Sequence, residues 1–297
     1  MGNNKKKVLI IGAKGRVGNL LSEYLARSGF EVTATFKNAK KPNNGGINWI
    51  SGDVLNIDDN FKEELKKAEI IIYLAAKLGM YDRQVWTVNV EGIKNTLRFL
   101  KNKNKTRLIF FSSIDAFGLT NKKEVNENNK VDPITDYGKS KLRAEREIVL
   151  FSKRNKNLKF VILRVGNIVG IEGNLIDDLN KRLTKNRLER WFLKNILGDC
   201  ELSVVDINLI LRVVEAIILR ENFNNKIRFL SEKTVKINCF FKQSVIKECL
   251  REIMSWVMIK IKRGGFYLYL AMKNGDKRYR RFSKKILNEL NIKIING

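Results

Sequence analysis

The sequence predicts a doubly wound α/β fold, a parallel sheet with helices on both faces, followed by a smaller C-terminal lobe. Three observations lead to this prediction. Short apolar runs alternate with stretches of helical spacing over the first half of the chain, a glycine-rich turn joins the first such pair, and both signals thin out after about residue 174. The chain has 297 residues and can bury a sizeable core. We expect residues 1–170 to form the sheet domain and residues 171–297 a mainly helical lobe whose strands return to the sheet.

Three glycines separate the first predicted strand from the first predicted helix. Residues 8–11 are an apolar run typical of a buried parallel strand, and the glycines that follow are spaced G-x-x-G-x-x-G. Glycine permits a tight turn and lets the backbone at a helix N-terminus approach a diphosphate. The segment therefore predicts a dinucleotide-binding site; the alternative is a turn that is merely sharp. We assign to the site Gly12, Lys14, Gly15, Arg16, Val17 and Gly18.

The end of the second predicted strand, residues 31–36, bears on the choice of cofactor. Sites that prefer NAD place an Asp or Glu there to bind the ribose 2′-hydroxyl, whereas this chain has Phe36 and Lys37, with Arg16 and two more lysines nearby in sequence. Because cations would bind a 2′-phosphate, we predict NADP(H) rather than NAD(H), with Phe36 and Lys37 at the site. The alternative is that these lysines form a solvated face of a lysine-rich protein.

The next two predicted strands, residues 47–51 and 69–76, supply further candidate cofactor contacts. Asp53 follows the first of them and is expected to hydrogen-bond an adenine edge while Val54 packs on the ring. Alternatively, Asp53 only caps the turn before a helix at residues 61–67. The second strand is apolar, as a central parallel strand is, and the alanines at its end would let a cofactor approach closely. The contacts expected there are Leu74, Ala75 and Ala76.

Three more segments complete this half of the chain. A long helix is expected from about residue 83 to residue 101, and a polar surface loop at residues 121–129. A strand at residues 158–164 leads to Asn167 at the sheet edge where ligands bind in open parallel sheets. Asn167 either contacts substrate or satisfies the backbone of the turn.

Tyr137 and Lys141 are four residues apart on a predicted helix and so share one face. A tyrosine phenol titrates near pH 10, too high for a general base at neutral pH. A lysine ammonium on the next turn, together with an oxidised nicotinamide, would lower the pKa of Tyr137. Ser113 follows a predicted strand at residues 107–111 and is placed to hydrogen-bond the same substrate oxygen. This set can move a proton at a carbonyl or alcohol while a hydride moves to or from the nicotinamide.

Composition excludes several other kinds of site. The chain has no histidine, which removes Ser-His-Asp and Cys-His catalytic sets and every histidine-dependent metal site. Its 3 cysteines are scattered, so we expect no metal site, no disulfide framework and a cytoplasmic setting. The net charge of +27 would attract phosphates, nucleic acid or an anionic membrane, but lysine is abundant throughout and no nucleic-acid-binding motif occurs. We expect no nucleic-acid partner.

Several segments occur together in an order and at spacings typical of one family. They are the glycine turn and residues 52–53, 74–76, 89–92, 112–118, 137–141 and 163–170. Together they resemble the extended short-chain dehydrogenase/reductase family, in particular its NAD(P)-dependent nucleotide-sugar epimerase, dehydratase and reductase branch. The resemblance implies a Rossmann-type sheet domain, a C-terminal lobe that binds the nucleotide-sugar, and a homodimer through helices near residues 85–100 and 142–150.

The resemblance also implies roles for individual residues. Tyr137 is the acid/base, Lys141 is its partner and a ribose ligand, Ser113 orients the substrate, and Asn89 lies near these catalytic groups. The family's 4,6-dehydratases carry Asp-Glu directly after the residue equivalent to Ser113, whereas this chain has Ile-Asp, which argues against water elimination. The substrate contacts expected from this set are Ser113, Asp115 and Asn167.

The activities that remain are C4 epimerisation and 4-keto reduction of a nucleotide-activated sugar, in the synthesis of surface-polysaccharide sugars. NADP dependence would favour reduction, because a reductase draws on NADPH whereas an epimerase recycles bound NAD. The alternative is a non-catalytic sensor that binds NADP(H) and signals to a partner. Such a protein has no need of Ser113, Tyr137 and Lys141.

The C-terminal third carries weaker signals. We expect a basic helix at residues 177–197, a strand at 202–206, a helix at 207–219 and a strand at 226–230. Residues 253–272 are apolar and aromatic, but lysine, arginine and glycine interrupt them, so they do not predict a membrane-spanning helix. With the basic residues that follow, this segment would make weak peripheral contact with an anionic membrane. The alternative, which we favour, is that it packs on the core.

Overall fold

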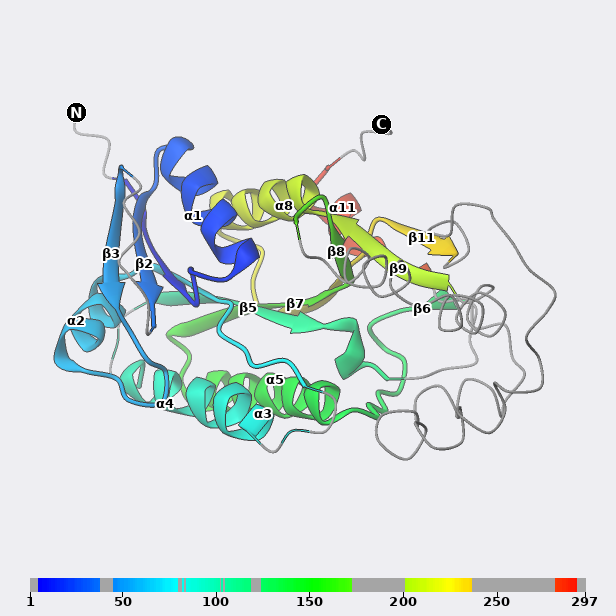
Figure 1. Cartoon of the computed structure of the whole chain (residues 1–297), viewed down its shortest axis with the longest axis horizontal. Helices are drawn as coiled ribbons and strands as arrows, with labels where there is room; N and C mark the ends of the chain where they lie inside the picture. The colour runs from blue at the N-terminus through cyan, green and yellow to red at the C-terminus, as the bar shows by residue number, and fades with distance from the viewer. Residues whose placement is uncertain are drawn as a thin grey trace, which may run out of the picture.

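A seven-stranded sheet runs through the centre of the computed structural model (Figure 1), which describes residues 5–37, 45–79, 82, 84–101, 103, 105–118, 124–172, 201–236 and 281–292. The strand order is β10-β7-β5-β4-β1-β2-β3, and every neighbouring pair is parallel. This order reverses direction between β1 and β4, so the predicted doubly wound fold is confirmed. The strands are β1 (Lys7–Ile11), β2 (Glu31–Phe36), β3 (Ile47–Ser51), β4 (Ile70–Tyr73), β5 (Thr106–Ser113), β7 (Leu158–Val165) and β10 (Lys226–Leu230).

Helices cover both faces of this sheet (Figure 1). Successive residues of β1 divide between the two faces: Val8 and Ile10 join one buried apolar cluster, whereas Leu9 and Ile11 join the other. Side chains alternate along a strand, so an unbroken apolar run fits a strand that is covered on both sides. The first face carries α1 (Arg16–Arg27), α8 (Ile207–Leu219) and α11 (Lys285–Glu289), and the second carries α2 (Asp59–Lys67), α4 (Gly92–Phe99) and α5 (Asp136–Arg154).

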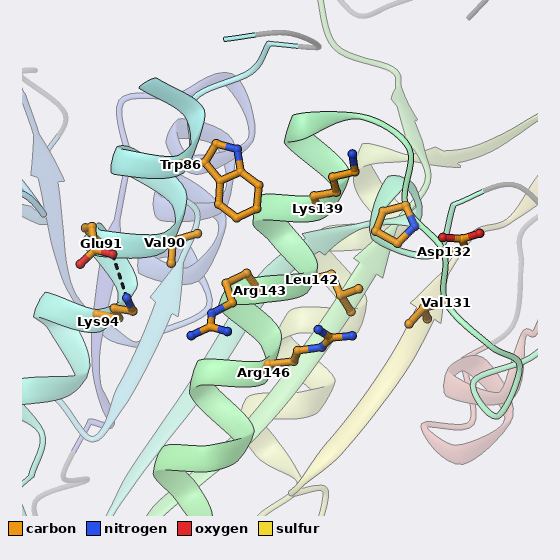
Figure 2. A pocket seen from close by; sticks show the side chains of 11 residues that line it. Trp86, Val90, Glu91, Lys94, Val131, Asp132, Lys139, Leu142, Arg143 and Arg146 are labelled. Carbon is orange, nitrogen blue, oxygen red and sulfur yellow. Dashed lines mark hydrogen bonds and ion pairs between the residues drawn. The ribbon is translucent and has the colours of Figure 1, made fainter. Parts of the chain in front are cut away.

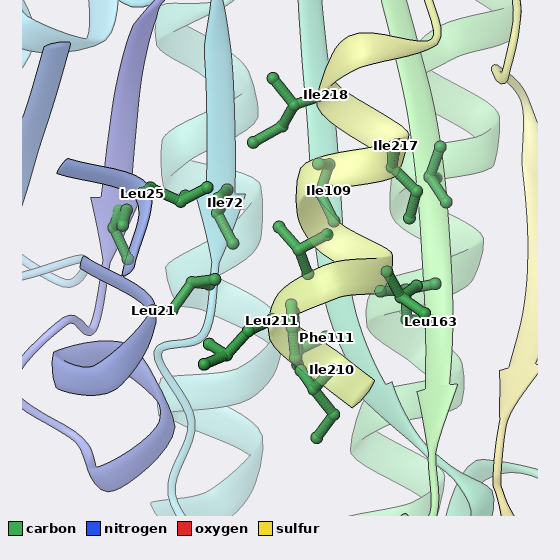
Figure 3. Close-up of a cluster of buried hydrophobic side chains, with 14 of the residues drawn as sticks. Leu21, Leu25, Ile72, Ile109, Phe111, Leu163, Ile210, Leu211, Ile217 and Ile218 are labelled. Carbon is green, nitrogen blue, oxygen red and sulfur yellow. The ribbon is translucent and has the colours of Figure 1, made fainter. Parts of the chain in front are cut away.

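Helix α8 covers the middle of the first face (Figure 3). Its Ile210, Ile217 and Ile218 are buried in one cluster with Ile109 of β5 and Leu163 of β7. Full burial of each such side chain stabilises the fold by about 1.5–3 kcal/mol. The helix lies at the predicted residues 207–219, and β10 lies at the predicted residues 226–230. Both come from beyond residue 170, yet they complete the main sheet and its cover.

Two predicted segments differ in detail from the structure. The long helix predicted near residues 83–101 is three successive pieces: α3 (Gln84–Trp86), a π-helical turn (Thr87–Glu91) and α4. A single inserted residue barely alters the apolar spacing, so periodicity does not reveal a π-turn. The polar loop predicted at residues 121–129 contains β6 (Glu124–Val125), which pairs with β12 (Arg281–Phe282). That pairing joins segments far apart in sequence and leaves no local signal.

A smaller three-stranded sheet lies beside the main one. It contains β8 (Asn167–Val169), β9 (Glu201–Asp206) and β11 (Lys233–Lys236). The predicted helix at residues 177–197 lies outside the described residues, as does the apolar segment at residues 253–272, whether it packs on the core or contacts a membrane. The division of the chain at residue 170 stays a prediction. Among the helices that the structure describes, none is long and apolar enough to cross a lipid bilayer.

Candidate active site

The glycine turn after β1 lies directly against the end of β4. The backbone N–H of Leu74 donates to the carbonyl of Ile11 at 2.8 Å and holds the two strand ends together. Gly12 has a φ of +82°, and a Cβ placed on it would stand 2.6 Å from the backbone nitrogen of Ala75. Only glycine fits so close an approach in this conformation. The turn and the predicted contacts at residues 74–76 therefore meet where the sheet order reverses, which is where open α/β sheets bind ligands.

Helix α1 begins without a side-chain cap. Gly15 occupies the N-cap position and provides no side-chain hydrogen bond. A Cβ on Gly18 would stand 2.6 Å from the Cα of Ala13, so glycine allows the first turn of α1 to pack onto the glycine turn. The backbone N–H groups of that turn carry the positive end of the helix dipole, and Lys14 and Arg16 lie exposed beside them. These residues fit the diphosphate of a dinucleotide.

The predicted adenosine end of the site contains an ion pair. The Lys37 ammonium lies 2.6 Å from one carboxylate oxygen of Asp53, and the other oxygen accepts a hydrogen bond from the backbone N–H of Leu55 at 3.0 Å. Burial acts to raise the pKa of Asp53, but the hydrogen bonds from Lys37 and Leu55 outweigh it, and the net pKa is lowered. Lys37 thus has a carboxylate partner within the protein. Phe36 is partly buried at the end of β2, and Val54 is buried in the core.

The N-terminus of α5 packs against the turn that follows Ser113. Thr135 caps the helix, its hydroxyl oxygen accepting a hydrogen bond from the backbone of Gly138 at 2.8 Å. A Cβ on Gly138 would stand 2.3 Å from the carbonyl oxygen of Asp115. Gly138 thus allows Tyr137 to lie beside this turn. Gly138 itself is not among the predicted site residues. A glycine within a helix is unfavourable, and its presence in the first turn is the signal that points to this contact.

Lys141 is buried between α5 and β5. Its ammonium donates a hydrogen bond to the carbonyl of Phe111 at 2.8 Å. The same nitrogen stands 4.9 Å from the centroid of the Phe110 ring and 5.8 Å from that of the Tyr137 ring. Burial lowers the pKa of Lys141 to about 7, and the carboxylate of Glu145 acts in the opposite direction. At neutral pH this lysine therefore changes charge easily.

Tyr137 and Ser113 are the other two predicted catalytic groups. In the protein alone, burial raises the pKa of Tyr137 above its ordinary value, and the nearby charge of Asp115 raises it further. The sequence predicts a lowered pKa for Tyr137 when Lys141 and an oxidised nicotinamide act on it together. The protein groups alone, without the nicotinamide, do not lower this pKa. The hydroxyl oxygen of Ser113 accepts a hydrogen bond from the backbone of Asp115 at 3.1 Å, which orients the serine side chain.

Asn89 lies in the π-helical turn and is 1% exposed. Its amide accepts a hydrogen bond from the backbone N–H of Lys77 at 2.8 Å, and donates to the carbonyl of Lys77 at 3.1 Å and to the hydroxyl of Ser140 at 3.0 Å. Ser140 in turn donates to the carbonyl of Tyr137 at 2.7 Å. Asn89 thus links the loop after β4 to the first turns of α5, and its contacts help to position the helix that carries Tyr137.

The remaining predicted substrate contacts differ in their surroundings. Asp115 is exposed at the start of the turn after β5. Asn167 is partly buried, and its side-chain amide donates a hydrogen bond to the carbonyl of Ser203 at 3.1 Å. Ser203 belongs to β9 and not to the turn, so both alternatives for Asn167 stay predictions.

A cavity of about 600 Å³ lies between α5 and the helical segment that contains Trp86 and Val90 (Figure 2), and Lys141 does not line it. Trp86 and Val90 line it from α3 and the π-helical turn, and Lys139, Leu142 and Arg143 line it from α5. None of the predicted cofactor or catalytic residues contributes to it. The chemistry predicted from the sequence therefore belongs to the sheet edge and not to this cavity.

Comparisons with known proteins show the family to which the chain is similar. The NAD dependent epimerase/dehydratase family matches residues 8–201. A UDP-glucose 4-epimerase of Lactobacillus helveticus is 26% identical over 191 residues, which cover 58% of this chain and 55% of the relative. The N-acetyl-alpha-D-glucosaminyl-diphospho-ditrans,octacis-undecaprenol 4-epimerase of Escherichia coli O157:H7 is 30% identical over 185 residues, 53% of each protein. The chain spans about half the length of the curated relatives it matches.

Solved structures share the fold at lower identity. MoeE5 in complex with UDP-glucuronic acid and NAD has a TM-score of 0.68 at 18% identity, covering 98% of this chain and 94% of that one. The UDP-glucuronic acid 4-epimerase from Bacillus cereus, in complex with UDP-glucuronic acid and NAD, has a TM-score of 0.69 at 17% identity, covering 98% and 95%. The terminal R domain of the myxalamid PKS-NRPS pathway reaches 0.74 at 17% identity, covering 98% and 86%. At these identities the likeness shows the fold alone.

Proposed function

We propose that this chain, which belongs to the NAD-dependent epimerase/dehydratase family, inverts the C4 hydroxyl of a nucleotide-activated sugar. The observation that carries the proposal is the placement of Tyr137 and Lys141 on one face of α5, beside the turn after Ser113 and at the same sheet edge as the glycine turn. The curated relatives named above are 4-epimerases, which supports C4 as the reacting carbon.

The chain supplies the proton transfer for this reaction. When bound, a nicotinamide dinucleotide supplies the hydride acceptor and later the hydride donor at C4, and its oxidised ring carries a positive charge. Tyr137 accepts the proton of the C4 hydroxyl as the carbonyl forms, and returns it after the carbonyl has been reduced from its other face. The positive charge of Lys141 favours the phenolate of Tyr137, and the Ser113 hydroxyl hydrogen-bonds the same sugar oxygen. Removal of water needs a further acid, and the residue after Ser113 is Ile114.

We propose NAD rather than NADP as the cofactor, which revises the preference expected from the sequence. Lys37, one of the cations expected to bind a 2′-phosphate, is paired with Asp53 at 2.6 Å. NAD is also the dinucleotide named in the complexes of MoeE5 and of the Bacillus cereus epimerase. An epimerase that returns its hydride in each turnover has no need of an NADPH supply.

The first test is made on the purified protein without added cofactor. We expect acid extraction to release NAD, identified by mass, in roughly stoichiometric amount, and we expect the protein to convert at least one of UDP-glucose, UDP-N-acetylglucosamine and UDP-glucuronic acid to its 4-epimer. Chromatography of the UDP-sugars measures the conversion. Retention of NAD with no change in any of them would contradict the epimerase proposal.

Two other outcomes of this test have definite meanings. A protein that carries no dinucleotide and oxidises added NADPH with a 4-keto nucleotide-sugar is a reductase. A protein that binds NADP(H) and turns over neither kind of sugar supports the sensor alternative, against which the set of Ser113, Tyr137 and Lys141 counts. The surface-polysaccharide role and the cytoplasmic location stay predictions, as does the substrate-binding role of residues 171–297.

We also propose a homodimer formed through α3, α4 and α5. Three large apolar side chains on these helices, Trp86, Phe99 and Leu150, are 38%, 38% and 47% exposed, and Trp86 borders the cavity of Figure 2. We expect sedimentation velocity to show a dimer, and Trp86→Glu to shift it to monomer. Leu219→Glu is the matched control, because Leu219 is 60% exposed on α8, across the sheet. A dimer that survives Trp86→Glu and is lost in Leu219→Glu would place the interface on the other face.

A further inference from the structure

A third residue on the catalytic face of α5 has no part in the reaction described so far. Tyr137, Lys141 and Glu145 follow one another at intervals of four residues, so they lie on one side of the helix on three successive turns. The Glu145 side chain is 2% exposed. A buried carboxylate is costly unless it is paired, so its partners indicate why it is there.

Glu145 is held by a serine and an arginine. One carboxylate oxygen accepts hydrogen bonds from the Ser112 hydroxyl at 2.6 Å and from Nε of Arg164 at 3.0 Å, and the other accepts from Nη2 of Arg164 at 2.7 Å. The Arg164 side chain is 4% exposed, and its guanidinium carbon stands 5.5 Å from the centroid of the Phe229 ring. Loss of one partner from such a pair leaves an uncompensated buried charge, whereas an exposed ion pair is worth little.

These bonds hold the strand that carries Ser113. Ser112 precedes Ser113 at the end of β5 and stands opposite Arg164 of β7 in the sheet register. One turn earlier on α5, Lys141 donates to the carbonyl of Phe111, the residue before Ser112. Two successive residues of β5 are thus tied to two successive turns of α5. Together these ties set where Tyr137 stands relative to Ser113.

The same carboxylate acts on the charge of Lys141. Glu145 is the charged group that acts on Lys141, and the Tyr137 ring lies one turn earlier on α5. Arg164 of β7 pairs with Glu145, and Asp115 acts on Tyr137 from the turn after β5. Burial lowers the pKa of Lys141 to about 7, and Glu145 is the carboxylate that acts against this. Without it, Lys141 would lose the carboxylate that acts on it, and the buried Arg164 would lose its ion-pair partner.

We propose that Glu145 is a positioning residue, which fastens α5 to the end of β5 and supplies the counter-charge of Lys141. The proposal rests on the proposed function, in which Tyr137, Lys141 and Ser113 act together. We assign Glu145 no contact with substrate or cofactor. It acts through Tyr137, Lys141 and Ser113, which make those contacts.

The first experiment compares variants of the NAD-loaded enzyme. We expect Glu145→Gln to lower kcat by up to about 100-fold with little change in KM, because the reacting groups are displaced. We also expect the limb of the kcat–pH profile that reports the loss of the Lys141 proton to move down by about one pH unit. Glu147→Gln is the matched control: Glu147 pairs with Arg143 at 2.7 Å on the more exposed side of the same helix, and neither kcat nor the pH limb is expected to change.

Two further variants separate charge from position. Glu145→Gln combined with Arg164→Gln removes the whole ion pair and leaves no unpaired buried arginine, and we expect kcat to stay low and the pH limb to stay lowered, because Glu145 is the charge that acts on Lys141. Ser112→Ala removes one hydrogen bond and no charge, so it should lower kcat modestly and leave the limb where it is. These two variants also keep the proposal testable if Glu145→Gln alone does not fold.

The second experiment needs neither substrate nor cofactor. The pKa of Lys141 is lower in the folded protein than in the unfolded chain, so the free energy of unfolding falls as pH drops toward 7 and levels off once the folded lysine is protonated. In Glu145→Gln the folded lysine takes up its proton at lower pH, so the loss of stability continues below 7. We expect the stability difference from wild type, measured by denaturant unfolding, to widen between about pH 7 and pH 6.

The outcomes distinguish the two proposals. A wild-type protein that leaves all nucleotide-sugars unchanged contradicts the epimerase function, and the widening stability difference still reports the charge link between Glu145 and Lys141. An active wild type whose Glu145→Gln variant keeps its kcat and pH limb, with a stability difference that is constant from pH 6 to 7, overturns the positioning role.

Discussion

Replacing Tyr137 by phenylalanine is expected to lower the rate of C4 epimerisation by about 10²- to 10⁴-fold, the range that general acid–base groups usually contribute. The substitution removes the phenol oxygen and keeps the ring that lies 5.8 Å from the Lys141 ammonium, so the packing of α5 should persist. NAD affinity should change little, because the glycine turn and the N-terminus of α1 are untouched. Steady-state turnover and NAD fluorescence titration measure the two effects separately.

A second tyrosine provides the control for this substitution. The Tyr24 hydroxyl donates to the carboxylate of Glu215 at 2.6 Å, between α1 and α8 and away from the predicted catalytic groups. Tyr24→Phe removes the same atom there, and we expect it to cost about 1 kcal/mol of stability with turnover unchanged. Near-normal turnover in Tyr137→Phe would remove Tyr137 from the mechanism, and an equal loss in both variants would point to a general effect on folding.

Replacing Gly12 by alanine is expected to abolish NAD binding and to lower the free energy of unfolding by about 2–5 kcal/mol. Two costs add. Alanine at a φ of +82° is strained, and its Cβ would stand 2.6 Å from the backbone nitrogen and 2.7 Å from the Cα of Ala75. Backbone atoms cannot rotate aside as a side chain does, so the ends of β1 and β4 must move apart. Isothermal titration with NAD and denaturant unfolding measure these effects.

Gly46 is the matched control, because it has the same φ of +82° and no atom within 4 Å of the position that a Cβ would take. Gly46→Ala therefore carries the backbone strain without the collision, and we expect it to cost about 1–2 kcal/mol and to leave NAD binding intact. If Gly12→Ala binds NAD with wild-type affinity, the turn does not approach the cofactor. If both variants lose the same stability, the contact with Ala75 carries no cost.

The fold was predictable because its signals are local. The apolar run before Gly12 and the alternation of strands with helices recur on a scale of a few residues, and the structure confirms β1, α8 and β10 near their predicted bounds. The π-helical turn and the pairing of β6 with β12 escaped the prediction for the opposite reason. One depends on a single extra residue, and the other on segments more than a hundred residues apart.

The sequence by itself determined the strands of the main sheet and most of the helices that cover it. It placed Ser113 at the carboxyl edge of that sheet, and Tyr137 and Lys141 on one face of a helix. Only the tertiary structure decided which side chains and backbone groups around the site contact one another. It paired Lys37 with Asp53, set Gly138 against the carbonyl of Asp115, and buried Glu145 with Arg164. The charge of a buried side chain depends on how deeply it is buried and on its distance from other charges. Both are set when segments far apart in sequence come together, so the spacing of residues within one segment does not encode them.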